Sequence, residues 1–246
     1  MHIEYHKWYS ERLGRDMELK VYGHYGKPVL VFPSSGGRFH EYEDFKMIEA
    51  AAPFINEGKV KFICIDSIDK ETWLNKDASD AHIGGRHEAF HRYVTQEVVP
   101  FIYELCGGAI GICTHGCSMG AYHAANFFFK DPEIFDAVLA FSGVYDVKRV
   151  LQRDYNSEQI YFNSPLDYLP NMGDPWFLTR YQHSKIVICV GQGAWEDEMR
   201  EDTAQLRSIL EAKGIDAWID FWGYDVDHDW PWWRKQIVHF LPHIAD

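Results

Sequence analysis

The segment with the clearest chemical potential is G-C-S-M-G at residues 116–120, where Ser118 stands between two glycines. The pattern G-x-S-x-G is typical of a nucleophile elbow, a sharp turn from a strand into a helix that exposes the serine hydroxyl. An apolar run at Ala109–Cys113 precedes the motif and an alanine-rich helical pattern follows it, which is the context that such a turn requires. The sequence therefore predicts Ser118 as a nucleophile, the alternative being a serine that caps a helix. Cys117 is expected to point away from the exposed tip as a packing residue.

A serine hydroxyl attacks efficiently only when a base removes its proton. On chains with such an elbow, the acid and then the histidine follow the serine in sequence. His228 lies in a polar loop, G-Y-D-V-D-H-D-W at residues 223–230, between a late strand pattern and a C-terminal helical pattern. His123, His239 and His243 fall instead within helical patterns. We predict His228 as the base, the alternative being an ordinary solvated loop histidine.

Two neighbouring acids are candidates for the group that orients the histidine. The strand predicted at Lys185–Val190 is followed by G-Q-G-A-W-E-D at residues 191–197, which places Glu196 and Asp197 just beyond the strand. Adjacent residues point in different directions in most turns, so one of the two is expected to reach the ring. Asp197 also stands near the start of a helical pattern, where an aspartate can cap free N–H groups.

Acyl transfer also needs two N–H donors for the oxyanion that develops on the carbonyl oxygen. The residue after the nucleophile, Met119, is expected to provide one of them. The other is expected from the loop F-P-S-S-G-G-R at Phe32–Arg38, whose glycines allow close approach of the backbone. We favour Gly36, with Ser35 next, and the alternative is a plain glycine-rich turn.

Taken together, these segments resemble the putative esterase family. This branch of the α/β-hydrolase superfamily includes esterase D (S-formylglutathione hydrolase), enterochelin esterase-like enzymes and the mycolyltransferases. The similar stretches are spread over most of the chain: F-P-S-S-G-G-R-F-H-E-Y-E-D-F at 32–45, G-C-S-M-G-A-Y-H-A at 116–124, Y-F-N-S-P-L-D-Y-L-P-N at 161–171, G-Q-G-A-W-E-D at 191–197 and H-D-W-P-W-W at 228–233.

The resemblance implies a Ser–acid–His triad and the hydrolysis of small or short-chain acyl esters without a cofactor. In the similar stretch of esterase D an aspartate stands three residues after Q-G, and that register selects Glu196 over Asp197. The chain departs from the commoner pattern at Cys117, where the middle residue of the motif is often polar or aromatic. It also lacks a segment long enough for a large cap domain.

A rival motif, H-E-A-F-H at residues 87–91, matches the zinc-binding pattern H-E-x-x-H. On a helix, His87 and His91 would lie one turn apart and could bind zinc, with the intervening glutamate as base. The extended motif needs glycine and histidine further on, where this chain has Val94 and Glu97. A zinc-dependent metallohydrolase therefore remains the alternative enzyme class, and a non-catalytic binding protein on the same fold is a third possibility.

The elements that must position these residues follow an alternating pattern. Short apolar runs, typical of buried parallel strands, alternate with segments of helical periodicity, and two early segments alternate in polarity like antiparallel strands. We therefore predict a single α/β-hydrolase domain over residues 1–246, with a mostly parallel central sheet flanked by helices. The predicted strands are Ile3–Tyr9, Met17–Tyr22, Pro28–Phe32, Val60–Ile65, Ala109–Cys113, Ala137–Phe141, Lys185–Val190 and Ala217–Trp222. The predicted helices are Arg86–Leu105, Met119–Phe129 and Met199–Ala212, and Tyr145–Arg180 is predicted to pass over one end of the sheet.

Composition restricts the partners. The formal net charge of −13 disfavours nucleic acid and anionic membrane surfaces, and no apolar run reaches the roughly 18 residues that span a bilayer. Five cysteines, an odd number, favour free thiols in a reducing compartment, and residues 1–10 lack the pattern of a signal peptide. We therefore expect a cytoplasmic protein that acts on a small-molecule ester, with no cofactor and no metal. A homo-oligomer is compatible with the sequence.

Overall fold

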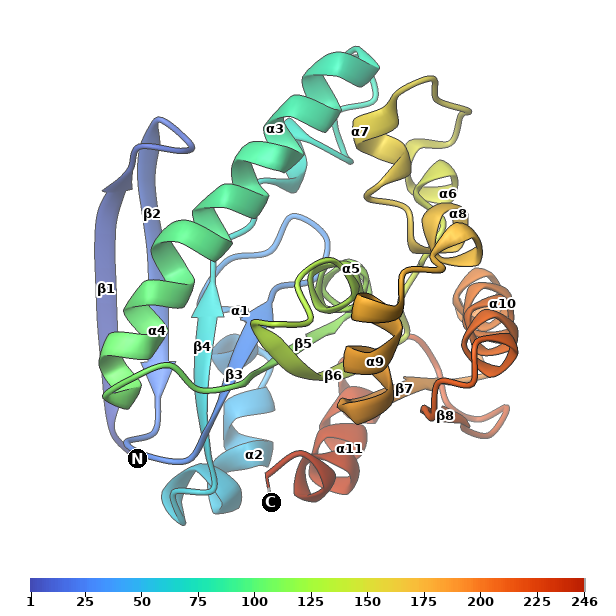
Figure 1. The fold of residues 1–246 in the computed structure, drawn as a ribbon. Helices are drawn as coiled ribbons and strands as arrows, with labels where there is room; N and C mark the ends of the chain where they lie inside the picture. Colours follow the sequence, from blue (N-terminus) through green and yellow to red (C-terminus); the bar gives the residue numbers. More distant parts are fainter. Residues whose placement is uncertain (246) are drawn as a thin grey trace.

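Eight strands form one open sheet in the computed structural model of the chain, which describes residues 1–245 (Figure 1). Their order across the sheet is β1-β2-β4-β3-β5-β6-β7-β8. β2 pairs with β1 and with β4 in the antiparallel sense, and all other neighbouring strands are parallel. The strands are β1 (Ile3–Ser10), β2 (Arg15–Tyr22), β3 (Lys27–Phe32), β4 (Val60–Ile65), β5 (Ile112–Cys117), β6 (Phe135–Phe141), β7 (Lys185–Val190) and β8 (Trp218–Phe221).

Strands β4 and β5 are buried along their whole length, because helices cover both faces of the sheet. This explains the continuous apolar runs, in contrast to the alternating exposure of the edge strand β1. Since β3, β5, β6, β7 and β8 are parallel, their carboxyl ends meet at one edge, where ligands bind in open α/β sheets. Ser118, Ser142 and the loop that begins at Gly191 directly follow β5, β6 and β7 at this edge.

Two helices cover one face of the sheet, and a larger group covers the other (Figure 1). On the first face α2 (Met47–Asn56) and α11 (Trp230–Phe240) lie side by side. On the opposite face lie α3 (Asp80–Tyr93), α4 (Val99–Cys106), α5 (Met119–Lys130) and α10 (Asp197–Ala212). Within residues 1–245, no helix has the length and apolar character needed to cross a membrane. The prediction of a single domain over residues 1–246 stays a prediction.

Strand β5 lies three to four residues later than predicted, at Ile112–Cys117 instead of Ala109–Cys113. The predicted strand ended at Cys113 because the next two residues, Thr114 and His115, are polar. Both of these side chains, however, have buried hydrogen-bond partners. The Thr114 hydroxyl donates to the Ala124 carbonyl at 2.9 Å, and His115 Nδ1 lies 2.6 Å from the Leu139 carbonyl oxygen. The strand therefore continues to Cys117, and the elbow follows it without an intervening loop.

The helix predicted at Arg86–Leu105 begins earlier and is interrupted. Ser79 caps α3 by accepting a hydrogen bond from the His82 amide, and a π-helical turn at Val94–Val98 joins α3 to α4. The excursion predicted at Tyr145–Arg180 is a chain of short helices rather than a loop. They are α6 (Val147–Leu151), α7 (Glu158–Tyr161), α8 (Pro165–Tyr168) and α9 (Pro175–His183), and α1 (Glu41–Asp44) is a further short helix after β3.

The elbow allows no side chain at Gly120. A Cβ atom there would lie 2.3 Å from the Phe32 carbonyl oxygen and 2.7 Å from that of Pro33. We expect Gly120→Ala to lower the free energy of unfolding by about 2 kcal/mol or more, because backbone atoms must separate. Gly85→Ala is the matched control: a Cβ there meets nothing within 4 Å inside α3, and the variant is expected to gain about 0.5–1 kcal/mol. Urea unfolding measures both, and equal midpoints for Gly120→Ala and the wild type would contradict the packing argument.

Candidate active site

Ser118 occupies the sharp turn between β5 and α5. Its backbone has φ 57° and ψ −122°, a sparsely populated conformation that costs on the order of 1–3 kcal/mol for a residue with a side chain. The turn projects the side chain from the carboxyl edge of the sheet, and Ser118 Oγ lies 2.9 Å from His228 Nε2. The structure therefore brings the predicted nucleophile and the predicted base into hydrogen-bond contact.

The loop that carries His228 is held by the loop after β7. The His228 amide donates to the Ala194 carbonyl at 3.0 Å, and the Gly193 amide donates to the Val226 carbonyl at 2.9 Å. Asp227 Oδ1 accepts from the Ala194 amide at 2.7 Å. These bonds fix the backbone on both sides of His228, and the Asp227 side chain thus stabilises the loop.

Glu196 is buried behind the histidine. Its Oε2 atom lies 3.3 Å from His228 Nδ1, and its Oε1 atom accepts a hydrogen bond of 2.6 Å from the Ser142 hydroxyl. Ser142 Oγ accepts in turn from Trp233 Nε1 at 3.1 Å. A carboxylate on the Nδ1 side favours the tautomer with its proton on Nδ1, which leaves the lone pair of Nε2 facing Ser118. This is the arrangement that a proton acceptor for the serine requires.

Within the described residues, Asp197 makes no hydrogen bond or ion pair with the histidine. Its side chain is 79% exposed and accepts a hydrogen bond from Arg200 at 3.1 Å. The cap expected at this residue is wrong, because Asp197 is the first residue of α10 and Glu196 holds the cap position without a side-chain cap bond. The candidate that lies next to His228 is therefore Glu196.

The two predicted oxyanion donors differ in what surrounds them. Met119 is the first residue of α5, where an amide has no partner within the helix. The Gly36 amide, in contrast, donates to Asp69 Oδ2 at 3.1 Å. Its N–H group is therefore already occupied by a carboxylate.

The neighbouring amides of this loop are also paired, with one exception. The Ser34 amide donates to Glu41 Oε2 at 2.7 Å, and the Gly37 amide donates to the Ser34 carbonyl at 2.9 Å. Between residues 34 and 37, the Ser35 amide alone has no acceptor within the described part of the chain. The loop thus leaves the N–H group of Ser35 available for a ligand.

Cys117 lies beneath the elbow, with its side chain buried as expected. The Tyr42 hydroxyl lies 3.3 Å from Cys117 Sγ and 3.1 Å from His115 Nε2. Burial raises the pKa of the Cys117 thiol, so the reactive thiolate is disfavoured. Burial lowers the pKa of His115 to about 4, so this histidine is neutral near pH 7.

The H-E-A-F-H segment has separate roles in packing and hydrogen bonding. His87 is buried and its ring stacks on His123, while His91 Nε2 lies 2.6 Å from Asp131 Oδ2. The intervening glutamate accepts from a lysine of α5 at 3.0 Å. Within residues 1–245, no group of three or more potential metal ligands is arranged to hold an ion. Contacts within the fold therefore account for His91 and the glutamate, while both ring nitrogens of the buried His87 have no hydrogen-bond partner within the described residues.

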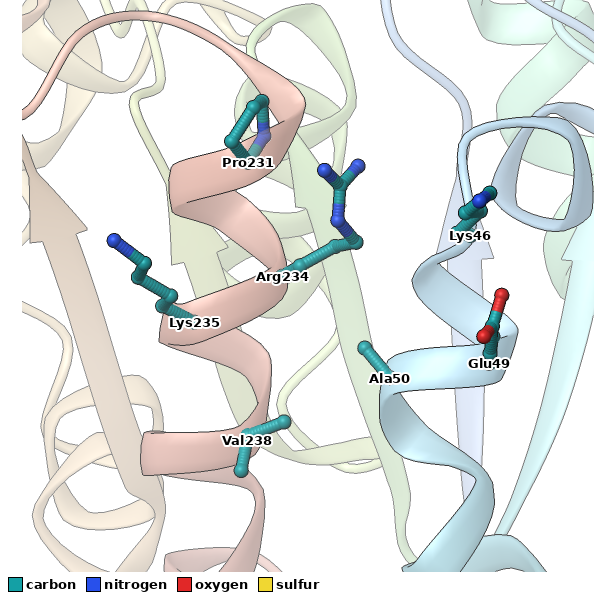
Figure 2. A pocket seen from close by; sticks show the side chains of 7 residues that line it. All are labelled: Lys46, Glu49, Ala50, Pro231, Arg234, Lys235 and Val238. Atoms are coloured by element: carbon teal, nitrogen blue, oxygen red, sulfur yellow. The ribbon is translucent and has the colours of Figure 1, made fainter.

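Two surface hollows differ in their relation to these residues. One of about 530 Å³ is lined by His228 together with Trp195, Asp197, Glu198 and Met199. A larger one of about 710 Å³ lies between α2 and α11, where the Arg234 side chain points toward α2 (Figure 2). None of the residues that line this larger hollow contacts Ser118. The size of a hollow therefore does not identify the candidate active site.

Two residues that hold the acid were missed by sequence reasoning. Ser142 follows β6 at the same edge of the sheet as Ser118, and its φ of 53° marks a second tight turn. Its position directly after the predicted strand Ala137–Phe141 could have indicated that Ser142 lies at the same edge of the sheet as Ser118. Trp233 lies on α11, and nothing in its local sequence indicates that the indole N–H reaches Ser142.

Comparisons with known proteins agree with the geometry. The family model described as "Putative esterase" matches residues 10–244, and a search of curated proteins finds no match. A ferulic acid esterase structure has a TM-score of 0.77 at 13% identity, covering 99% of this chain and 97% of its own. S-formylglutathione hydrolases from Agrobacterium tumefaciens (TM-score 0.76, 14% identity, coverage 99% and 94%) and Staphylococcus aureus (0.70, 17%, 100% and 100%) are also similar. These likenesses confirm the predicted α/β-hydrolase fold.

The two acids can be separated experimentally. We expect Glu196→Gln to lower turnover on the order of 10³- to 10⁴-fold, because a neutral amide does not stabilise the imidazolium that forms on His228. Asp197→Asn is the matched control, and we expect turnover and melting temperature close to those of the wild type, since this side chain is exposed. Kinetics with p-nitrophenyl acetate and thermal unfolding provide the data. The reverse pattern would move the acid to Asp197.

The buried His115 makes stability depend on pH. Its pKa is about 4 in the folded chain and about 6.5 when unfolded, so between these values the unfolded chain binds more protons. This contribution is complete above pH 6.5 and is lost as pH falls toward 4, by at most about 1.4 kcal/mol per pH unit. We expect the unfolding free energy of His115→Gln to fall less steeply than that of the wild type. Urea unfolding at several pH values measures both slopes, and parallel slopes would contradict the argument.

Proposed function

The chain belongs to the putative esterase family, and from this premise we propose that it is a carboxylic ester hydrolase in which Ser118 is the nucleophile. The observation that carries this proposal is the series of contacts from Ser118 Oγ to His228 Nε2 at 2.9 Å and from His228 Nδ1 to the buried Glu196 at 3.3 Å. Each group has the chemistry that its place in the series requires.

The proposed reaction proceeds through an acyl-enzyme. Ser118 Oγ attacks the ester carbonyl as its proton passes to His228 Nε2, and the negative charge of Glu196 stabilises the imidazolium. His228 then gives the proton to the alkoxide that leaves as the alcohol. Water, deprotonated by the same histidine, attacks the acyl-enzyme and releases the carboxylic acid and the free serine.

We assign the oxyanion donors to Met119 and Ser35. The Met119 amide lies at the start of α5, where the helix dipole also favours negative charge. Ser35 replaces Gly36 as the preferred second donor, because the Gly36 amide already donates to Asp69. In this proposal Gly36 supports the loop, and its neighbour contacts the oxyanion.

The surroundings of Met119 support a small or short acyl group. Its side chain packs into an apolar cluster with Trp73, Tyr122, Val147 and Leu151, all of them almost fully buried. Such a closed cluster leaves little room for a long chain. The hollow beside His228 is suited to the alcohol part of the ester, and its Trp195 side chain is 85% exposed. The structural neighbours include enzymes named for ferulate esters and for S-formylglutathione, so both acyl classes belong in a substrate panel.

We also propose that the protein acts in the cytoplasm on a small-molecule ester. All five cysteines are free thiols, which suits a reducing compartment. The net charge of −13 supports the absence of nucleic acid and membrane surfaces among its partners.

The decisive experiment removes the nucleophile. We expect Ser118→Ala to remain folded and to lose p-nitrophenyl acetate hydrolysis by about 10⁶-fold, the usual cost of losing a triad nucleophile. A fluorophosphonate should label the wild type once, and peptide mapping should locate the label on Ser118. Circular dichroism and thermal unfolding control for the fold of the variant. Near-native turnover by Ser118→Ala, or a label on another residue, would refute the proposal.

A further inference from the structure

A second carboxylate–imidazole pair lies behind the loop that carries Ser35. His123 Nε2 lies 2.8 Å from Asp69 Oδ1, and both side chains are 1% exposed. The other carboxylate oxygen, Asp69 Oδ2, accepts the Gly36 amide at 3.1 Å. A buried carboxylate requires such partners, because burial without them is costly. The pair therefore joins α5 to the loop after β3 through two hydrogen bonds in series.

Both members of the pair are themselves held in place. The backbone carbonyl of Asp69 accepts hydrogen bonds from the amides of Thr72 and Leu74, at 3.1 and 2.9 Å. The His123 ring stacks on Phe32, at 5.7 Å between ring centroids, and also on His87 at 5.7 Å. The position of the Gly36 amide is thus set by groups that have little freedom to move.

His123 lies on the same helix as the nucleophile and the first oxyanion donor. Ser118 precedes α5, Met119 begins it, and His123 follows one turn later, with its ring directed to Asp69 instead of to the reactive edge. A displacement of α5 relative to the loop would break the bond to Asp69. The pair thereby sets the separation between the Met119 amide and the loop that contains Ser35.

A different acid holds the loop on its other side. Glu41 accepts both the amide and the hydroxyl of Ser34 at 2.7 Å. The amides immediately before and after Ser35 therefore both donate to carboxylates, and the Ser35 amide between them is left unpaired within residues 1–245. This pattern orients one N–H group by holding its two neighbours.

We propose that Asp69 and His123 are positioning residues that hold the oxyanion loop at the distance from α5 that the transition state requires. The proposal rests on the proposed function, because it assumes that the Ser35 and Met119 amides receive the oxyanion. Neither residue takes part in proton transfer with the substrate. Their effect is expected on turnover rather than on substrate binding, since the oxyanion is fully formed only near the transition state.

The experiment compares two histidines that each contact a carboxylate, His123 of α5 and His91 of α3. His123→Phe keeps a ring between Phe32 and His87 but removes the donor to Asp69, and His123→Gln restores an N–H donor. The matched control is His91→Phe, which breaks the His91–Asp131 contact of 2.6 Å at the opposite end of α5. Active sites are counted by fluorophosphonate titration to completion, so that misfolded protein does not enter the rate. For each variant we measure kcat, KM and the inhibition constant of n-butylboronic acid. This compound forms a tetrahedral adduct on a serine.

For His123→Phe we expect kcat per active site to fall about 10- to 100-fold, the usual cost of a small displacement at a reacting centre, with KM changed less than about threefold. The boronate constant should rise by a factor similar to the fall in kcat. His123→Gln should recover part of both losses, and His91→Phe should retain wild-type kcat even if its melting temperature falls.

Several results would overturn the assignment. If His123→Phe, or His123→Leu where the phenylalanine variant does not fold, loses only thermal stability and keeps wild-type kcat and boronate affinity, the pair is structural only. An equal loss of kcat in His91→Phe would likewise show a general effect of disturbing α5. Ser118→Ala, assayed in parallel, separates the two levels: if it retains turnover, the proposed function itself fails. If it is inactive while the His123 variants are normal, the positioning role alone fails.

Discussion

The site depends on the close contact between the start of α5 and the end of β3. Gly120 lies against the carbonyl groups of Phe32 and Pro33, and Gly116 lies against the backbone of Gly120, so closely that neither position has space for a Cβ atom. This contact accompanies the sparsely populated backbone conformation of Ser118, with φ 57° and ψ −122°, and brings the loop after β3 alongside the first turn of α5. The proposed nucleophile and the Met119 amide are thereby placed by backbone packing, whereas the Ser35 amide also depends on the side chains that hold its loop.

The acid side of the site is built differently, from hydrogen bonds between side chains. Glu196 follows β7, but its carboxylate is held by Ser142 after β6, which is held in turn by Trp233 of α11. The Trp233 ring also packs edge-on against His228 at 5.0 Å between centroids. A buried carboxylate with these partners keeps one orientation, so the histidine ring inherits its position from three separate segments of the chain.

The sequence allowed the fold class to be predicted, and it identified Ser118, His228 and Glu196 as candidates that the structure brings into contact, because both follow local rules. Apolar runs indicate buried strands, and the elbow motif depends on two glycines whose requirement is steric. Strand β5 was misplaced because the burial of His115 depends on Leu139 and Tyr42, which lie far away in sequence. The preference for Gly36 over Ser35, which stays a prediction, was made without Asp69, because local sequence does not show from which amide a distant carboxylate will accept a hydrogen bond. Interactions between segments that are distant in sequence decide these details, and the periodicity of apolar residues along the chain does not reveal such interactions.

The separation of the reacting groups along the chain has a consequence for biosynthesis. Ser118 and its partner His228 are 110 residues apart, and the indole that holds Ser142 comes later still. Because a chain is synthesised from its N-terminus and a domain generally folds as one unit, Ser118 meets His228 only after the C-terminal residues have been made. Until then, the proposed nucleophile has no proton acceptor beside it. The proposed hydrolytic activity therefore begins only once residues as late as Trp233 have been synthesised.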